Sequence, residues 1–225
     1  MKEINLTQDI EQDEFTEHVL SQYDVQDINT TILSPEDEID VDGEWNVGLI
    51  VGNSGSGKST ILSSMGIVHK NVWDDTTSMI SNFKDVLSPE DACLLLASVG
   101  LGSVPSWLRK YSTLSNGEKH RADLAMSIAK SPNKVVSFDE FTSVVNRDVA
   151  KAMSFALQKY ARRKKIKVIL ASCHYDIIDW LQPDWIHDCQ IGGIVKKKSN
   201  KDLQSTWRSF VARTKHGQSS ANITI

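Results

Sequence analysis

One nine-residue stretch, GNSGSGKST, carries the strongest chemical signal in this sequence. It spans residues 52–60 and matches the pattern G-x-x-x-x-G-K-[S/T]. Glycines have no Cβ, so the backbone can curl and aim its N–H groups at a phosphate. Lys58 is expected to reach the β- and γ-phosphates of a nucleotide, and the Ser59 hydroxyl to coordinate Mg²⁺. The predicted nucleotide-binding residues here are Gly52, Asn53, Ser54, Gly55, Ser56, Gly57, Lys58, Ser59 and Thr60.

Two adjacent carboxylates follow a second apolar segment, KVVSF at residues 134–138. Asp139, at the tip of a strand, has the oxygen ligands that Mg²⁺ prefers. Glu140 is suited to orient and deprotonate an attacking water molecule. Taken alone, the pair is also compatible with an acidic strand end facing solvent. The phosphate loop favours the catalytic interpretation, because both roles need a site beside bound phosphates.

A third stretch, LSNGEKHR at residues 114–121, has two compatible interpretations. Ser115 and Glu118 have the spacing of a capping box, in which each side chain binds a free backbone N–H group of the other residue. Ser115 and Gly117 at a helix start also form an anion site. The same free N–H groups can bind a side chain or a phosphate.

The elements around these motifs indicate how they are positioned. VGLIV, at residues 47–51, is an apolar strand directly before the phosphate loop, and a helix follows the loop. Strands alternate with helices, and polar residues follow the strand ends, which predicts an α/β fold with its site at the carboxyl edge of a mostly parallel sheet. The predicted strands are 28–33, 47–51, 134–138, 167–172 and a short one near 191, and the predicted helices are 14–25, 61–68, 91–100, 121–130 and 147–163, with a linker containing Pro183 before the last strand.

The ordered motifs resemble those of the ATP-binding-cassette (ABC) ATPases over roughly residues 20–195. LSNGEKHR resembles the family's signature, usually written LSGGQ and followed by an Arg. DEFTSVVN, at residues 139–146, resembles the segment that joins the acidic strand to the D-loop. His174, 34 residues after Glu140, resembles the switch histidine. Within the family, the sequence is most similar to soluble ABC-type ATPases that occur alone or fused to acetyltransferase-like domains.

The resemblance implies a P-loop NTPase fold and an ATP hydrolase that uses ATP and Mg²⁺. Two subunits would form a head-to-tail homodimer that encloses two ATP molecules. ATP binding would drive dimerisation and ATP hydrolysis would release the dimer. This cycle would drive a conformational change in an unknown protein partner. Tyr23 would either stack on adenine or pack on a helix face. The implied catalytic residues are Glu140, His174 and Lys58, the metal ligands are Ser59 and Asp139, and the residues acting on the partner's nucleotide are Ser115, Asn116, Gly117 and Glu118.

Several departures from the family pattern affect the expected function. Asn116 and Glu118 replace the second Gly and the Gln of the signature. No Gln occurs between Gln26 and Gln158, so the family's Gln loop is missing, and Asp74 or Asp75 would have to replace its contact. Ser115 lies only 57 positions after Lys58, which predicts a shortened helical subdomain and argues against a transporter subunit.

The D-loop also departs from the family pattern. Asn146 replaces its Asp, which predicts slow or differently regulated turnover.

Composition favours a cytoplasmic protein without membrane insertion. The 225 residues are 40% hydrophobic and 24% charged, and no apolar run approaches the ~20 residues of a membrane helix. Cys93, Cys173 and Cys189 lack a disulfide framework and are interpreted as reduced thiols. The expected organisation is an acidic N-terminal segment (1–26), an ABC ATPase domain (27–195) and a basic C-terminal tail (196–225).

Charge and metal-ligand patterns leave two minor alternatives. The tail and the run KYARRKKIK at residues 159–167 are basic, so nucleic-acid binding, as in a DNA-associated ABC ATPase, remains open. Solvated tails and a helix end that favours cations explain the same charges. Cys173, His174, His187 and Cys189 lack the spacing of a common zinc site. The tryptophans Trp107, Trp180 and Trp185 are expected to be packing residues.

Overall fold

The structure is a computed structural model that describes residues 4–7, 13–23, 30–33, 43–65, 71–131, 135–190 and 193–196. The chain divides into two compact units, Met1–Ile39 and Asp40–Ile225, which are described separately. The basic tail after residue 196 therefore lies outside the described residues. None of the helices within those ranges has both the length and the apolar character that a membrane span requires.

The N-terminal unit contains a helix and a two-stranded antiparallel ribbon. Strand β1 (Ile4–Thr7) pairs with β2 (Thr30–Leu33), and helix α1 (Glu14–Tyr23) lies between them in the sequence. Asp13 starts the helix, because its carboxylate accepts hydrogen bonds from the backbone N–H groups of Phe15 and Thr16 at 3.0 and 2.8 Å. The predicted helix and strand are confirmed, whereas β1 was not predicted.

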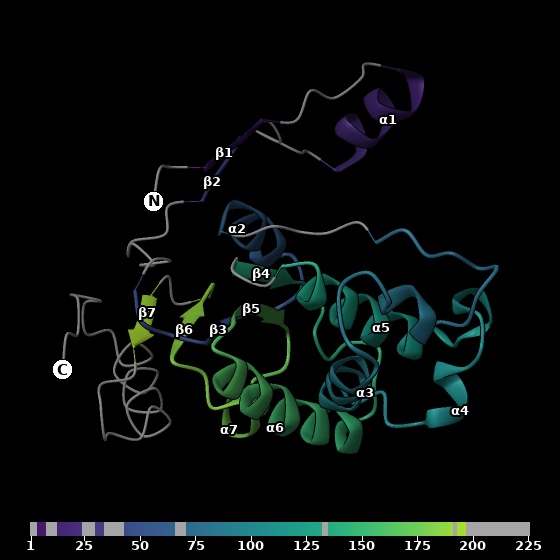
Figure 1. Cartoon of the computed structure of the whole chain (residues 1–225). Coiled ribbons are helices and arrows are strands. Elements are labelled where there is room, and N and C mark those ends of the chain that lie inside the picture. The colour runs from purple at the N-terminus through teal and green to yellow at the C-terminus, as the bar shows by residue number, and fades with distance from the viewer. Residues whose placement is uncertain are drawn as a thin grey trace. The chain divides into compact units, whose positions relative to one another are not determined.

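The second unit is built on a five-stranded sheet of the described residues, in the order β4-β5-β3-β6-β7 (Figure 1). The first four strands are parallel and β7 is antiparallel to β6. The mostly parallel α/β sheet predicted from the sequence is therefore confirmed. The strands are β3 (Val47–Val51), β4 (Val135–Phe138), β5 (Lys167–Ser172), β6 (Trp185–Asp188) and β7 (Gly193–Lys196).

The central strand β3 is buried on both faces, as its continuous apolar sequence indicates. Helix α2 (Lys58–Met65) contacts β4 and β5, and helix α6 (Arg147–Lys164) contacts β3, so helices cover both sides of the sheet (Figure 1). Gly48 is needed because the ring of Trp185 lies against its backbone, where a Cβ would be 2.0 Å from a ring carbon. The sheet thus forms a rigid base for the loops at its carboxyl edge.

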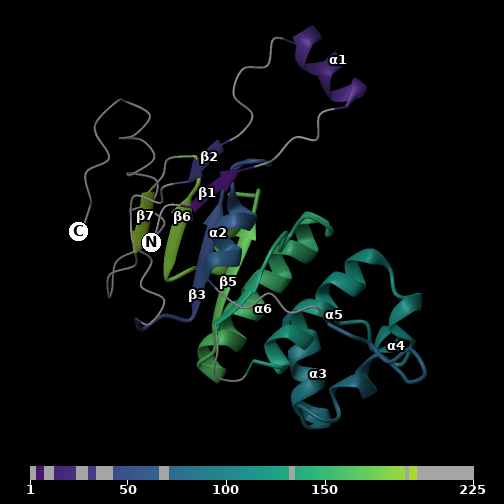
Figure 2. The same cartoon turned by 90° about the horizontal axis from the view of Figure 1, so that it is seen from above.

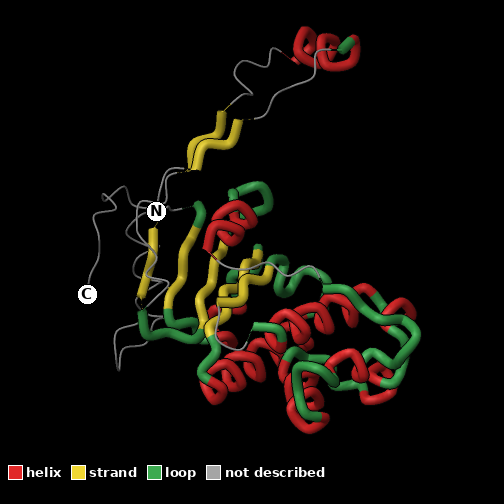
Figure 3. The backbone as a smooth tube through the Cα atoms, turned by 45° about the horizontal axis from the view of Figure 1, so that its top comes forward, coloured by secondary structure: helices red, strands yellow, loops and turns green. Residues whose placement is uncertain are grey.

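A smaller helical part lies beside the sheet, as two perpendicular views show (Figures 1 and 2). Figure 3 shows that it is built of helices and loops alone. Its side chains and those of the sheet form one continuous hydrophobic core, in which Phe83, Leu96 and Met153 are buried. Its elements are η1 (Ile80–Phe83), α3 (Pro89–Ser98), α4 (Val104–Trp107), η2 (Tyr111–Thr113) and α5 (Asn116–Ala129).

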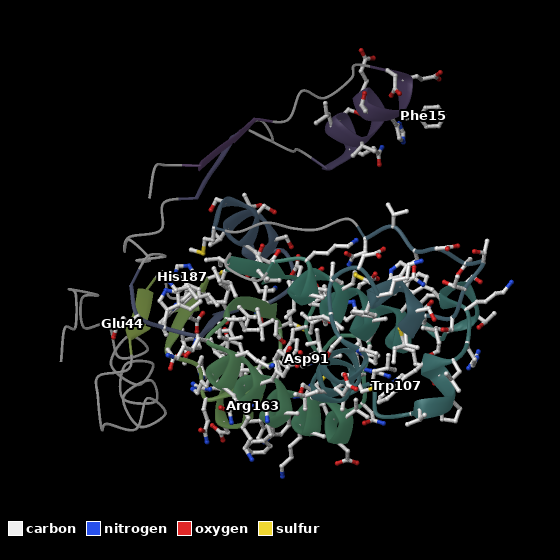
Figure 4. The ribbon with its side chains drawn as sticks, in the orientation of Figure 1. Phe15, Glu44, Asp91, Trp107, Arg163 and His187 are labelled. Atoms are coloured by element: carbon white, nitrogen blue, oxygen red, sulfur yellow. The ribbon has the colours of Figure 1, made fainter. Side chains whose placement is uncertain are left out.

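Two elements near the C-terminal end of this unit were predicted wrongly as a linker. Helix α7 spans Ile177–Leu181, and β6 pairs in parallel with β3. All four residues of β6 are buried although two of them are His187 and Asp188. A four-residue strand with two polar side chains has no clear period, so only its pairing with β3 identifies it. The packing role predicted for Trp107 and Trp185 is confirmed, since both are buried. Figure 4 labels Trp107 at the helical part of this unit.

Candidate nucleotide-binding site

The phosphate loop connects the end of β3 to the start of α2, the context that its motif requires. Gly55 and Gly57 have φ angles of +78° and +85°, a conformation that residues with a Cβ rarely adopt. No atom lies within 4 Å of a Cβ placed on Gly55, so this side of the loop is open. The loop therefore presents backbone on an accessible surface at the helix N-terminus, where anions bind.

Lys58 places a buried ammonium group beneath this loop. The residue is 6% exposed, and its Nζ donates a hydrogen bond of 2.7 Å to the carbonyl oxygen of Asn53. Its described partner is therefore a neutral carbonyl oxygen, whereas a buried cation is best stabilised by an anion. The ammonium, the helix N-terminus and the open glycine backbone together fit the phosphates of a nucleotide. The exposed Ser59 follows in the first turn of α2, where its hydroxyl suits a phosphate-bound Mg²⁺.

Asp139 and Glu140 directly follow β4, at the same edge of the sheet as the phosphate loop. Asp139 Oδ1 accepts a 2.8 Å hydrogen bond from the backbone N–H of Glu140. Glu140 is exposed and has a φ angle of +53°, which is uncommon for a residue with a side chain. Such a conformation persists only where neighbouring contacts hold it. The hydroxyl of Ser143 donates to the Glu140 carboxylate, and the backbone N–H of the fully buried Phe141 donates to Ala171 at 3.0 Å.

His174 follows β5, the strand between β3 and β4, and is connected to the segment after Glu140. Its Nδ1 lies 2.9 Å from Thr142 Oγ1, which in turn lies 2.9 Å from Ser172 Oγ. Thr142 and Ser172 are completely buried, so this short chain of hydrogen bonds is held in place. Thr142 and Ser172 were not identified from the sequence. In the sequence, the one indication of their role is that each is a small hydroxyl residue at or near the end of a strand, which is a weak signal.

The LSNGEKHR stretch forms the N-terminus of α5, and the predicted capping box is confirmed. Ser115 Oγ accepts from the backbone N–H of Glu118 at 3.3 Å, and the Glu118 carboxylate accepts from the Ser115 N–H at 2.8 Å. Leu114 is buried in the core, whereas Ser115 and Asn116 are exposed. The N–H groups of Asn116 and Gly117 have no acceptor among the residues that the structure describes. The turn therefore presents free donors to the outside of the subunit.

Glu118 holds the start of α5 through hydrogen bonds from two other residues. Besides the Ser115 backbone, the hydroxyl of Ser106 on α4 donates to Glu118 Oε1 at 2.5 Å. The Ser106 hydroxyl, followed by the Ser115 N–H, lowers the pKa of Glu118 to about 2. The side chain is therefore a carboxylate at neutral pH, and it connects α4 to α5.

Asp74 and Asp75, the residues expected to replace the Gln-loop contact, form hydrogen bonds within the chain. Asp74 accepts hydrogen bonds from the N–H and hydroxyl of Thr76, and Asp75 accepts one from the Ser112 N–H at 2.9 Å. Trp73 is anchored to α5, since its Nε1 donates to Asp123 Oδ1 at 2.8 Å. A contact of Asp74 or Asp75 with Mg²⁺ therefore stays a prediction.

Two further predictions concern an adenine contact and a zinc site. Tyr23 ends α1 in the N-terminal unit, so its stacking on adenine also stays a prediction. Within the described ranges, no three His, Cys, Asp or Glu side chains gather as a possible metal site.

Part of the basic run 159–167 is paired within the chain. Arg162 forms an ion pair with Asp184 at 3.1 Å, and Lys164 forms one with Asp91 at 2.8 Å. Lys167 lies over the ring of Trp45. Arg163, labelled with Asp91 in Figure 4, is exposed on α6. The run therefore stabilises the fold at several points, which weakens its interpretation as a surface for nucleic acid.

Comparison with known proteins identifies the fold. No protein-family model and no curated protein match this sequence. Among solved structures, a dimeric bacterial ABC transporter cassette, MJ0796, is similar with a TM-score of 0.50 and 15% identity, over 72% of this chain and 86% of that one. The post-hydrolysis MJ0796 dimer bound to ADP and phosphate has a TM-score of 0.50 and 14% identity, over 71% and 84% of the two chains.

An ATP-bound bacterial exporter of the Atm1 family is similar over part of its length. Its TM-score is 0.50 and its identity 19%, over 79% of this chain and 38% of the exporter chain. Because all three sequence identities are below 25%, these similarities show the fold alone. Together with the parallel sheet, the loop between β3 and α2 and the helical part that carries LSNGEKHR, they show that this chain has the fold of an ABC ATP-binding cassette.

Proposed function

We propose that the chain is an ABC-type ATPase that hydrolyses ATP in a nucleotide-sandwich homodimer and thereby moves a partner protein. The observation that carries this proposal is the buried Lys58 ammonium beneath an open glycine loop, at the sheet edge that also bears Glu140 and His174. Lys58 and the backbone of residues 52–60 would bind the phosphates. Ser59 and Asp139 would hold Mg²⁺, which supplies charge neutralisation for phosphoryl transfer.

Glu140 is the residue proposed to activate water. It is an exposed carboxylate two residues after the apolar strand β4, where a water molecule can come within hydrogen-bond reach of it. His174 would sense the γ-phosphate, and Thr142 is a positioning residue for His174 because of the 2.9 Å contact between them. In this proposal the Glu140 carboxylate and the His174 imidazole act together, because both are hydrogen-bonded to residues 142–143 of the same segment.

The dimer is proposed because the α5 N-terminus begins with exposed residues. Asn116 and Gly117 have free N–H donors at this helix start, where Asn116 is exposed and Gly117 is half-buried, and a helix N-terminus favours a phosphate of a second subunit's nucleotide. The Glu118 carboxylate close to these donors would have to be accommodated on dimerisation, a departure from the Gln of the family pattern. The solved cassettes of MJ0796 are dimers, which is consistent with this arrangement.

The test is the Glu140→Gln variant, which keeps the size of the side chain and removes the base. With Mg²⁺-ATP it should bind nucleotide and accumulate as a dimer in gel filtration with light scattering, whereas the wild type should turn ATP over. Lys58→Met is the matched control and should neither bind ATP nor dimerise. A Glu140→Gln protein that binds ATP and stays monomeric would refute the sandwich.

The proposed partner is a protein other than a transmembrane subunit, because only 57 positions separate Lys58 from Ser115, where the resemblance implies a longer insert for transporter cassettes. A role on DNA is the second candidate, favoured only by the exposed Lys159, Arg163 and Lys165. Binding to DNA should then weaken steeply with salt as phosphate contacts are lost. Absence of binding at low salt removes this candidate without affecting the ATPase proposal.

A further inference from the structure

Helix α5 contacts the Glu140 segment of its own chain at two points. His120 Nε2 lies 3.0 Å from the backbone carbonyl oxygen of Glu140, and the His120 ring packs against Phe138 with 4.6 Å between ring centroids. One turn earlier, a Cβ on Gly117 would lie 2.9 Å from the carbonyl oxygen of Val144. The helix that starts at the signature turn is therefore in direct contact with the backbone of segment 139–146 at two positions.

The contact of His120 is a hydrogen bond with a defined direction. A carbonyl oxygen only accepts, so Nε2 of His120 must carry the proton. Burial lowers the pKa of His120, which favours the neutral ring at neutral pH. The Glu140 carbonyl also accepts from the Ser143 N–H at 3.1 Å. His120 is thus one of two donors to the peptide group of a residue with a φ angle of +53°.

From these contacts we propose that His120 is a positioning residue that transmits the state of the signature turn to Glu140 of the same subunit. The inference rests on the proposed function, in which that turn binds the partner's ATP. When the turn binds the partner's ATP, α5 moves or becomes more rigid. The hydrogen bond from His120 Nε2 to the Glu140 carbonyl oxygen transmits this change to the backbone that orients the Glu140 carboxylate. Binding of ATP at one site of the dimer therefore affects the orientation of Glu140 at the other site.

The experiment compares His120→Ala and His120→Gln with the wild type in the full chain. ATP affinity, measured with a fluorescent ATP analogue, should stay within about twofold, because His120 does not touch the phosphate loop. The kcat of His120→Ala should fall about five- to tenfold, the effect of one neutral hydrogen bond. Its Hill coefficient for ATP should also fall towards one. His120→Gln should recover most of both, since its amide can donate to the same carbonyl.

Ile128→Val is the matched control on the same helix. It removes a methyl group from the core face and should lower Tm without changing kcat or the Hill coefficient. A His120→Ala protein with wild-type kcat and cooperativity would overturn the coupling while leaving the ATPase proposal intact. A wild-type protein that hydrolyses no ATP would overturn both, and equal losses in His120→Ala and His120→Gln would overturn the assignment to the donated hydrogen bond.

Discussion

Replacing Glu118 by Gln tests how the signature turn is held. Glu118 accepts from Ser106 Oγ at 2.5 Å and from the backbone N–H of Ser115 at 2.8 Å. Gln keeps an acceptor oxygen for one of these bonds and can serve in a capping box, but it loses the negative charge at a helix N-terminus. The variant therefore removes the negative charge together with one of the two acceptor oxygens.

The size of the effect follows from the pKa. A fall of the Glu118 pKa from 4.5 to about 2 corresponds to about 3 kcal/mol at 1.36 kcal/mol for each pH unit. Because the Glu118 side chain is only partly buried and still reaches water, screening reduces this to about 1 kcal/mol. The folded-state pKa is lowered, so the stabilisation is fully present above the unfolded value of 4.5 and is lost as the pH falls towards 2.

The assay is urea unfolding of both proteins at several pH values from 7 down to 3.5. The wild type should be about 1 kcal/mol more stable than Glu118→Gln at pH 7, and the difference should shrink below pH 4.5. Asp85→Asn, which replaces an exposed carboxylate outside this turn by its amide, is the control for the substitution itself and should leave the free energy of unfolding at pH 7 unchanged. A difference for Glu118→Gln that does not change with pH would refute the reasoning.

Three further predictions follow from described contacts. Asn146→Ala should lose about 1 kcal/mol in urea unfolding, because Asn146 Oδ1 caps α6 through the Val149 N–H at 2.9 Å, whereas Asn146→Asp should retain the stability. Thr142→Val should lower kcat about tenfold with ATP affinity unchanged, since His174 loses its hydroxyl partner, and an unchanged kcat would contradict the positioning role. Gly48→Ala should cost about 1–3 kcal/mol through overpacking against Trp185, and wild-type stability would show that the ring can move away.

The sequence was sufficient for those parts of the site that local patterns specify. The phosphate loop requires glycine at fixed positions, Lys58 at a helix start and an apolar strand before it, and all of these are visible in neighbouring residues. The capping box of Ser115 and Glu118 is equally local, because its two partners are three residues apart. The apolar strand before Asp139 and the parallel sheet followed from hydrophobic runs.

Contacts between distant segments could not be predicted in this way. Strand β6 is short and half polar, and it exists because β3 pairs with it. The bonds of His174 to Thr142 and of His120 to Glu140 join residues 32 and 20 positions apart. Hydrophobic periodicity states which face of an element is buried but not which element covers it. The sequence by itself therefore determined the chemistry of the loop and of the carboxylates. Only the tertiary structure, through the order of the strands and the packing of α5, decided which side chains hold those groups in place.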